Sequence, residues 1–258
     1  MKRTHVTVAA SRGALLLLLP LLSLSAGCAH RQFSTTQTGR FDGKVMNVLN
    51  QRGNIYAYAP AIGQPANQYT FTQGSVSRGV HTMVKGDAVA LTICPQAGTR
   101  QDTCAQGPEP NVDYTVRVPK QARASLFTAN GSIHVTDVSG PVDARVRSGD
   151  IKIQIPSYAD ASTQNGNVTV MFGDPQWPGT LHFSSDHGDV EVWVPATADA
   201  SVYLHTDHGT IFTDFNLRGS SKGSAETIVG TIGQGGSRKV DVRVSNGSIR
   251  MLKLTPQM

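Results

Sequence analysis

The sequence predicts an all-β protein of the β-solenoid type, in which coils of roughly 20 residues stack on one another. The first observation behind this prediction is a recurring phrase: a turn residue, a glycine, a short polar residue, then isoleucine or valine. Seven copies lie 17 to 22 residues apart. Such a period is typical of coils that each bury an apolar side on a neighbour. The copies are Asn130–Ile133, Ser148–Ile151, Asn165–Val168, His187–Val190, His208–Ile211, Val229–Ile232 and Asn246–Ile249.

The second observation is that side chains at equal distances from these glycines are alike. Alternating apolar residues in such columns indicate half-buried strands that stack in register. Five residues before the glycine stand Leu126, Ala144, Ala161, Phe183, Leu204, Ala225 and Val242. Two residues after it stand Ile133, Ile151, Val168, Val190, Ile211, Ile232 and Ile249.

The third observation is a proline-containing repeat at Val118–Ser125, Ile155–Ser162 and Val194–Ser201. Proline has no N–H to give to a strand ladder, so it marks the end of a strand. Each coil of residues 118–258 is therefore expected to consist of a strand, a glycine turn, a second strand and a corner. Residues 41–117 carry a degraded copy at Gln51–Tyr58 and are expected to form irregular first coils with a disulfide loop.

An antiparallel β-sandwich or meander of hairpins is the alternative fold, because Asn-Gly between alternating segments is also a strong hairpin signal. The apolar columns fit both folds. Only three of the seven turns are Asn-Gly, however, and the near-constant period favours stacked coils.

Residues 1–27 are expected to be a lipoprotein signal peptide. Basic residues precede a short apolar run, and this segment contains no acidic residue. Leu24–Cys28 resembles the lipobox of bacterial lipoproteins, which implies a lipid on Cys28 that attaches the protein to the membrane. In that class, Ala29 in place of aspartate implies an outer-membrane lipoprotein, on either the periplasmic or the surface face. The polar residues 28–40 are expected to form a tether.

The charge of the chain gives no sign of nucleic-acid binding. The signal segment holds three of the 23 basic residues and none of the 18 acidic ones, so the remainder carries a net charge of +2. Nucleic-acid binding needs a concentrated basic face, and the sequence contains no such cluster.

Cys94 and Cys104 are expected to form a disulfide. With Cys28 assigned to lipid, they are an even pair in an oxidising compartment, on either side of a loop rich in turn-forming residues. The surrounding sequence does not resemble a redox-active Cys-x-x-Cys motif, so the bond is expected to pin the loop.

The lipobox, the segment Tyr114–Pro119 and the Asn-Gly-Ser-Ile phrase together resemble the bacterial "putative adhesin" β-strand-repeat family, a domain of unknown function. The resemblance covers residues 41–254 and is strongest from residue 112 onward. It implies a right-handed, β-helix-like solenoid on a cell-envelope protein, and it supplies no catalytic residues to transfer.

Four large side chains are candidates for a contact surface. Met171, Trp193 and Phe212 are expected to meet on one outer face, and the insertion that carries Trp177 projects from the same neighbourhood. Exposed aromatic clusters are typical of surfaces that bind sugar or protein. The alternative is that the Trp177 loop folds back over Trp193 and buries both rings.

Two Asp-His pairs precede successive glycines and are weak candidates for a metal site. These residues are Asp186, His187, Asp207 and His208. Polar turn residues repeated by duplication explain them better, so no metal or other cofactor is expected.

The function expected from the sequence is that of an adhesin-like interaction or scaffold module without catalysis, whose partner is a protein or a glycan. A carbohydrate-active β-helix enzyme, either a polysaccharide lyase or a hydrolase, is the alternative. Such an enzyme needs carboxylates paired across a groove or a basic residue beside calcium. The acids here lie singly at turns, and the oligomeric state is left open.

Overall fold

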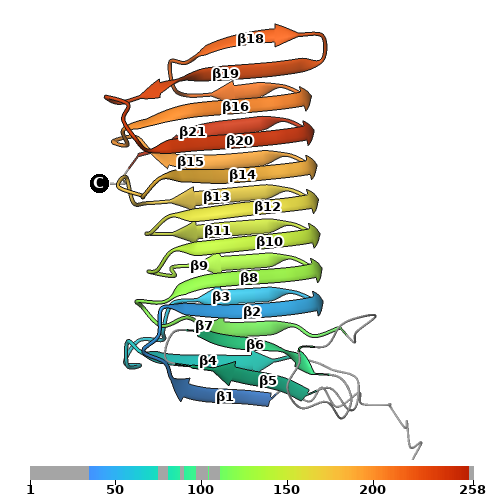
Figure 1. Cartoon of the computed structure of the whole chain (residues 1–258), viewed down its shortest axis with the longest axis vertical. Helices are drawn as coiled ribbons and strands as arrows, with labels where there is room; N and C mark the ends of the chain where they lie inside the picture. The colour runs from blue at the N-terminus through green and yellow to red at the C-terminus, as the bar shows by residue number, and fades with distance from the viewer. Residues whose placement is uncertain (1–34, 75–80, 88–89, 97–103, 105–110, 256–258) are drawn as a thin grey trace, which may run out of the picture. The chain divides into compact units, whose positions relative to one another are not determined.

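The computed structural model describes residues 35–74, 81–87, 90–96, 104 and 111–255, which form two β-sheets (Figure 1). The buried apolar side chains of the two sheets form one core. These described ranges contain no helix, and hence none that could cross a membrane. Sheet A has ten strands in the order β1 (Thr35–Arg40), β4 (Gln68–Gln73), β7 (Tyr114–Arg117), β3 (Ile55–Tyr58), β9 (Ile133–Thr136), β11 (Ile151–Ile155), β13 (Val168–Phe172), β15 (Val190–Pro195), β21 (Ile249–Leu254) and β17 (Ile211–Thr213). Sheet B has eleven in the order β18 (Arg218–Lys222), β19 (Ala225–Ile232), β16 (Ala200–His208), β20 (Lys239–Asn246), β14 (Thr180–His187), β12 (Ala159–Asn165), β10 (Val142–Ser148), β8 (Arg123–Asn130), β2 (Val45–Arg52), β6 (Ala90–Gln96) and β5 (His81–Gly86).

Equivalent strands of neighbouring coils pair in parallel through the middle of both sheets. In sheet A, Ile151 pairs with Ile133 on one side and with Val168 on the other. In sheet B, Ala144 pairs with Leu126 and Ala161. The predicted all-β stack is thereby confirmed. Within the described ranges, antiparallel pairing is confined to the two ends, which argues against a meander of hairpins.

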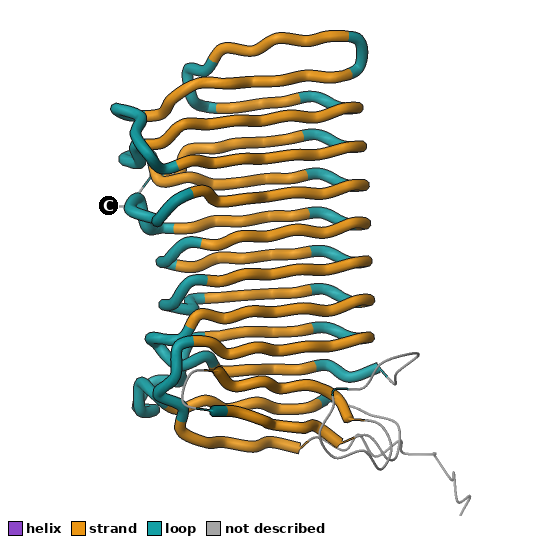
Figure 2. The backbone as a smooth tube through the Cα atoms, viewed as in Figure 1, coloured by secondary structure: helices purple, strands orange, loops and turns teal. Residues whose placement is uncertain are grey.

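The glycine phrase forms the turn between the two strands of a coil, and the turns lie one above another (Figure 2). Where the phrase forms a turn, the short polar residue after the glycine ties one turn to the next. Asn167 donates its N–H to Asp150 Oδ1 at 2.7 Å, and Asp189 N–H donates to Asn167 Oδ1 at 2.8 Å. Each turn therefore fixes its neighbour, which explains the recurring polar residue without any ligand.

Buried hydroxyls make a second set of bonds beneath the turns. Thr163 Oγ1 donates to the carbonyl of Gly149 at 3.0 Å, and Ser185 Oγ donates to that of Gly166 at 2.8 Å. A buried carbonyl left without a donor would be costly, so these polar residues belong to the core rather than to a binding site.

The coils do not stack in the order of the sequence. The C-terminal coil, β20–β21, lies between β14–β15 and β16–β17 (red between light orange and orange in Figure 1). The N-terminal coil, β2–β3, likewise lies between β6–β7 and β8–β9. The expectation that seven copies stack one after another is therefore wrong at the C-terminal end.

One of the seven copies is not a turn. Gly230 lies inside β19, which runs antiparallel to β16 and places Ile232 opposite Ala200. Together with β18, this strand continues sheet B by two strands beyond β16. The chain there turns back along the sheet instead of winding another coil. Towards the other end of the stack, the degraded copy at Gly53 does form a turn, which packs against that of Gly131.

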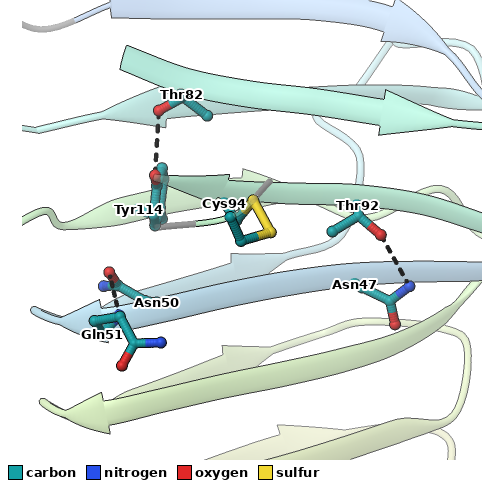
Figure 3. Close-up of a disulfide and its surroundings, with 8 residues drawn as sticks. Asn47, Asn50, Gln51, Thr82, Thr92, Cys94 and Tyr114 are labelled. Carbon is teal, nitrogen blue, oxygen red and sulfur yellow. Dashed lines mark hydrogen bonds between the residues drawn. A yellow bond between two sulfur atoms is a disulfide. The ribbon is translucent and has the colours of Figure 1, made fainter. Parts of the chain in front are cut away.

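The Cys94–Cys104 disulfide is formed, as predicted, and Cys94 is fully buried beside Tyr114 (Figure 3). The Tyr114 hydroxyl lies 3.2 Å from Thr82 Oγ1. Burial raises the pKa of Tyr114 to about 12, and the bond with Thr82 opposes this shift only in part.

Alkaline pH is expected to destabilise the protein through Tyr114. Below pH 10 the phenol is protonated in both the folded and the unfolded chain. Above pH 10 the unfolded chain loses this proton first, so the free energy of unfolding falls by about 2 kcal/mol by pH 12. Urea unfolding at pH 8 and pH 11.5 measures this loss. The Tyr114→Phe variant should show a smaller loss, and an equal loss in both proteins would contradict the assignment.

Candidate functional site

A groove of about 950 Å³ lies on the outer surface of sheet A. It runs across the C-terminal ends of β11, β13, β15 and β21 and the residues that follow β13, β15 and β21. Met171 on β13 pairs in register with Trp193 on β15, so these two predicted contact residues are neighbours. Both are partly exposed. The groove is lined by Gln154, Met171, Gly173, Trp193, Pro195, Ala196, Thr197, Lys253, Leu254 and Thr255.

Neighbouring charges fix the orientation of Trp193. Its Nε1–H donates to Glu191 Oε1 at 2.9 Å, two residues back on the same strand. Glu191 in turn forms an ion pair with Arg250 Nη1 on β21 at 3.2 Å. Because the indole N–H is already occupied, the apolar part of the ring is what Trp193 offers to a partner.

Trp177 does not belong to the contact surface, which corrects the sequence prediction. Only 1% of its surface is exposed, and its ring packs edge-on against Phe172 with centroids 5.4 Å apart. Its Nε1–H donates to the carbonyl of Lys239 at 3.2 Å. The loop therefore turns inward against the C-terminal coil, and Trp193 is not buried by it.

Phe212 lies on the same outer face but does not meet Met171 and Trp193, which is a second correction. It is 55% exposed and pairs with Arg250 on β21, which separates β17 from β15. Phe212 also stands in register with Glu191 rather than with Trp193. The inserted coil thus divides the predicted cluster.

The two Asp-His pairs are also divided by the inserted coil. His187 and His208 each pair with Asn246, so they lie two coils apart instead of one. His187 Nδ1 lies 3.3 Å from the Asn246 amide. In the described part of the chain, no three potential metal-ligating side chains gather in one place. Asp186, His187, Asp207 and His208 are best explained as exposed residues of the turn edge.

The outer surface of sheet B carries charged pairs that satisfy one another. Asp143 receives Arg145 Nε–H at 3.1 Å, and Asp241 receives Arg243 Nε–H at 2.8 Å. The bond with Asp241 raises the pKa of the Arg243 guanidinium, which also lies over the Tyr203 ring. A carboxylate held in this way is a poor candidate for a general acid or base.

The predicted lipidation residue, Cys28, lies outside the described residues. Arg250, Lys253 and Leu254 were missed as neighbours of Trp193, because only the insertion of β21 beside β15 brings them there. The sequence signal that could have suggested them is the apolar and basic composition of the last coil.

Stacked coils of two strands joined by a glycine turn define a repeat protein of the solenoid type, with an aromatic groove on its outer surface. The chain belongs to the family described as Toastrack DUF4097, whose model matches residues 116–251. This match begins within β7 and ends within β21, so it includes Met171 and Trp193 but not Lys253, Leu254 and Thr255 of the groove. No curated protein sequence matches the chain.

Three solved structures are similar at 8% sequence identity, and each covers 86% of this chain. A "putative cell adhesion protein" from Clostridium sporogenes is covered over 100% of its length, with a TM-score of 0.46. A "putative adhesin" from Bacteroides fragilis is covered over 97%, with a TM-score of 0.30. A "putative lipid binding protein" from Parabacteroides distasonis is covered over 97%, with a TM-score of 0.31.

Proposed function

We propose that this protein is a lipid-anchored interaction module of the bacterial cell envelope, which binds a glycan or a protein in the groove beside Trp193. The observation that carries the proposal is a partly exposed tryptophan whose orientation is fixed by Glu191 and Arg250. Aromatic anchors of this kind supply much of the binding energy in interfaces, and holding them in place before binding reduces the entropy cost.

The location follows from the sequence. A signal peptide over residues 1–27 and a lipid on Cys28 would attach the chain to the outer membrane through a polar tether. A right-handed solenoid with coils of roughly 20 residues would then present the groove beyond the membrane. The solved proteins described as adhesins are compatible with this location.

Binding without catalysis is favoured by the composition of the groove. Its lining, in the described part of the chain, includes Gln154, Lys253 and two threonines but no carboxylate. Glycoside hydrolysis usually requires two carboxyl groups on either side of the bond that is cleaved. The proposal therefore assigns the groove to recognition.

Replacing Trp193 with alanine tests the proposal. The purified protein and the variant are applied to immobilised envelope oligosaccharides and, separately, to solubilised envelope proteins. We expect the ligand found for the parent protein to bind the variant at least about tenfold more weakly, since anchor residues typically contribute 2 kcal/mol or more. The two ligand sets distinguish a glycan from a protein partner.

Phe212→Ala is the matched control, because Phe212 is an exposed aromatic residue on the same sheet but outside the groove. It should bind like the parent protein. Undiminished binding by Trp193→Ala, or an equal loss in both variants, would contradict the assignment of the groove. Product release from any of these glycans would instead favour an enzyme.

A further inference from the structure

The C-terminal coil occupies a gap between two coils that are consecutive in the sequence. β14 and β16 both pair in parallel with β20, and they do so in the same register. Phe183 and Leu204 lie on either side of Val242, and His187 and His208 lie on either side of Asn246. In sheet A, Val190 and Ile211 lie on either side of Ile249. If β20–β21 were absent, the neighbouring strands could therefore meet without any shift along their length.

The connection that passes over this gap is short. Only residues 196–199 join β15 to β16, although these strands belong to coils that are two steps apart. Elsewhere, residues 156–158 join β11 to β12, which belong to adjacent coils. Three residues are enough to join adjacent coils there, so the four residues 196–199 are long enough for β16 to stack directly on β14.

The buried hydroxyls also fit direct stacking. Thr206 Oγ1 now donates to the carbonyl of Gly247 at 2.7 Å. Val244, which pairs in register with both Ser185 and Thr206 and so holds the equivalent position in β20, has no hydroxyl to donate. If β16 moved next to β14, Thr206 would take the position of Val244 and could bond Gly188.

The segment that leads into the coil is rich in glycine. Residues 233–238 precede it and include Gly233, Gly235 and Gly236, all with positive φ. Five of its apolar side chains are at most 2% exposed, namely Val240, Val242, Val244, Ile249 and Met251. The coil therefore resembles a ligand that is buried between two walls and held by a glycine-rich linker.

We propose that the gap between β14–β15 and β16–β17 is an acceptor site for a strand, glycine turn and strand, and that residues 239–254 are its separable occupant. When the occupant leaves, β16–β17 closes onto β14–β15. Lys253 and Leu254 come from the occupant, so its presence also completes the groove beside Trp193. This last consequence rests on the proposed function, whereas the stacking itself does not.

A cleavable linker tests the proposal on the full chain. A protease site is inserted between Gly235 and Gly236, Cys28 is replaced by serine, and Ser184→Cys and His205→Cys are introduced. These two positions lie on either side of Arg243, about 9.6 Å apart at the usual strand spacing, which is too far for a disulfide. A second variant carries Ser184→Cys and Arg243→Cys. These residues pair across adjacent strands, so a disulfide between them shows that β20 lies beside β14.

In the uncleaved chain we expect the 184–243 disulfide and no 184–205 disulfide. After cleavage and removal of the peptide in dilute urea, the remaining chain should keep its β-sheet circular dichroism and form the 184–205 disulfide. A synthetic peptide of residues 239–255, added before oxidation, should prevent that bond. The Gly247→Ala peptide should not, because a Cβ there would overlap the carbonyl of Gly188.

Three results would overturn the proposal. The first is release of the peptide only when the whole chain unfolds. The second is a depleted chain that stays folded but does not form the 184–205 disulfide. The third is an equal effect of the 239–255 peptide and its Gly247→Ala variant on that disulfide. None of these results depends on partner binding, so a failure here is distinguishable from a failure of the proposed function.

Discussion

Replacing Trp177 with alanine is expected to lower the free energy of unfolding by about 3–5 kcal/mol, the usual cost of removing a large aromatic side chain from a core. The ring is 1% exposed and packs against Phe172, and the substitution leaves a cavity between that ring and the C-terminal coil. It also leaves the Lys239 carbonyl without the indole donor. Urea unfolding followed by circular dichroism measures the loss.

Trp193→Ala is the matched control for this measurement, because the chain has only these two tryptophans. Trp193 is partly exposed, so we expect a loss of no more than about 1 kcal/mol. Equal destabilisation by the two substitutions would show that Trp193 belongs to the core and would remove the basis for a contact surface.

Replacing Gly149 with alanine is expected to cost about 3 kcal/mol or more. Gly149 has a φ of +140°, which alanine rarely adopts, and an added Cβ would overlap the backbone carbonyl of Gly131 in the next turn. Neither coil can move away without breaking the ladder of turns. The thermal and urea midpoints should both fall.

Gly179→Ala separates the cost of the positive φ from the cost of the overlap with a neighbouring carbonyl. Gly179 has a φ of +68°, but a Cβ there would meet no atom within 4 Å. We expect a cost of about 1 kcal/mol, which reflects the left-handed backbone alone. If Gly149→Ala cost no more than Gly179→Ala, the close packing of successive turns would be contradicted.

The stacked fold could be predicted because its signals are local. A glycine turn, an alternating strand and a corner proline each follow from a few neighbouring residues, and they recur often enough to be aligned. Ile133, Ile151 and Val168, for example, belong to coils that are consecutive in the sequence and adjacent in the stack.

The order of the coils could not be predicted, because every coil presents nearly the same edge to its neighbours. Val242 pairs in register with both Phe183 and Leu204, and all three are apolar residues of the same column. The column pattern alone therefore does not determine which coils are adjacent. This ambiguity also explains the errors at the site. The inserted coil separates Phe212 from Trp193 and His187 from His208, and it brings Arg250 next to Glu191.

Trp177 was misplaced for a different reason. Its loop breaks the repeat and is rich in proline and glycine, which is typical of exposed segments. No periodic pattern shows that one aromatic residue of such a loop turns inward. Its burial depends on the space beside Phe172 and on the carbonyl of Lys239, which lies 62 residues away.

Quenching of tryptophan fluorescence by acrylamide, with and without a bound partner, tests most directly whether the groove is the contact surface. Trp177 is buried and Trp193 is partly exposed, so the quenchable emission comes from Trp193. We predict that a glycan or protein that binds the parent protein protects this emission from acrylamide. Saturating binding that leaves the quenching of Trp193 unchanged would contradict the assignment.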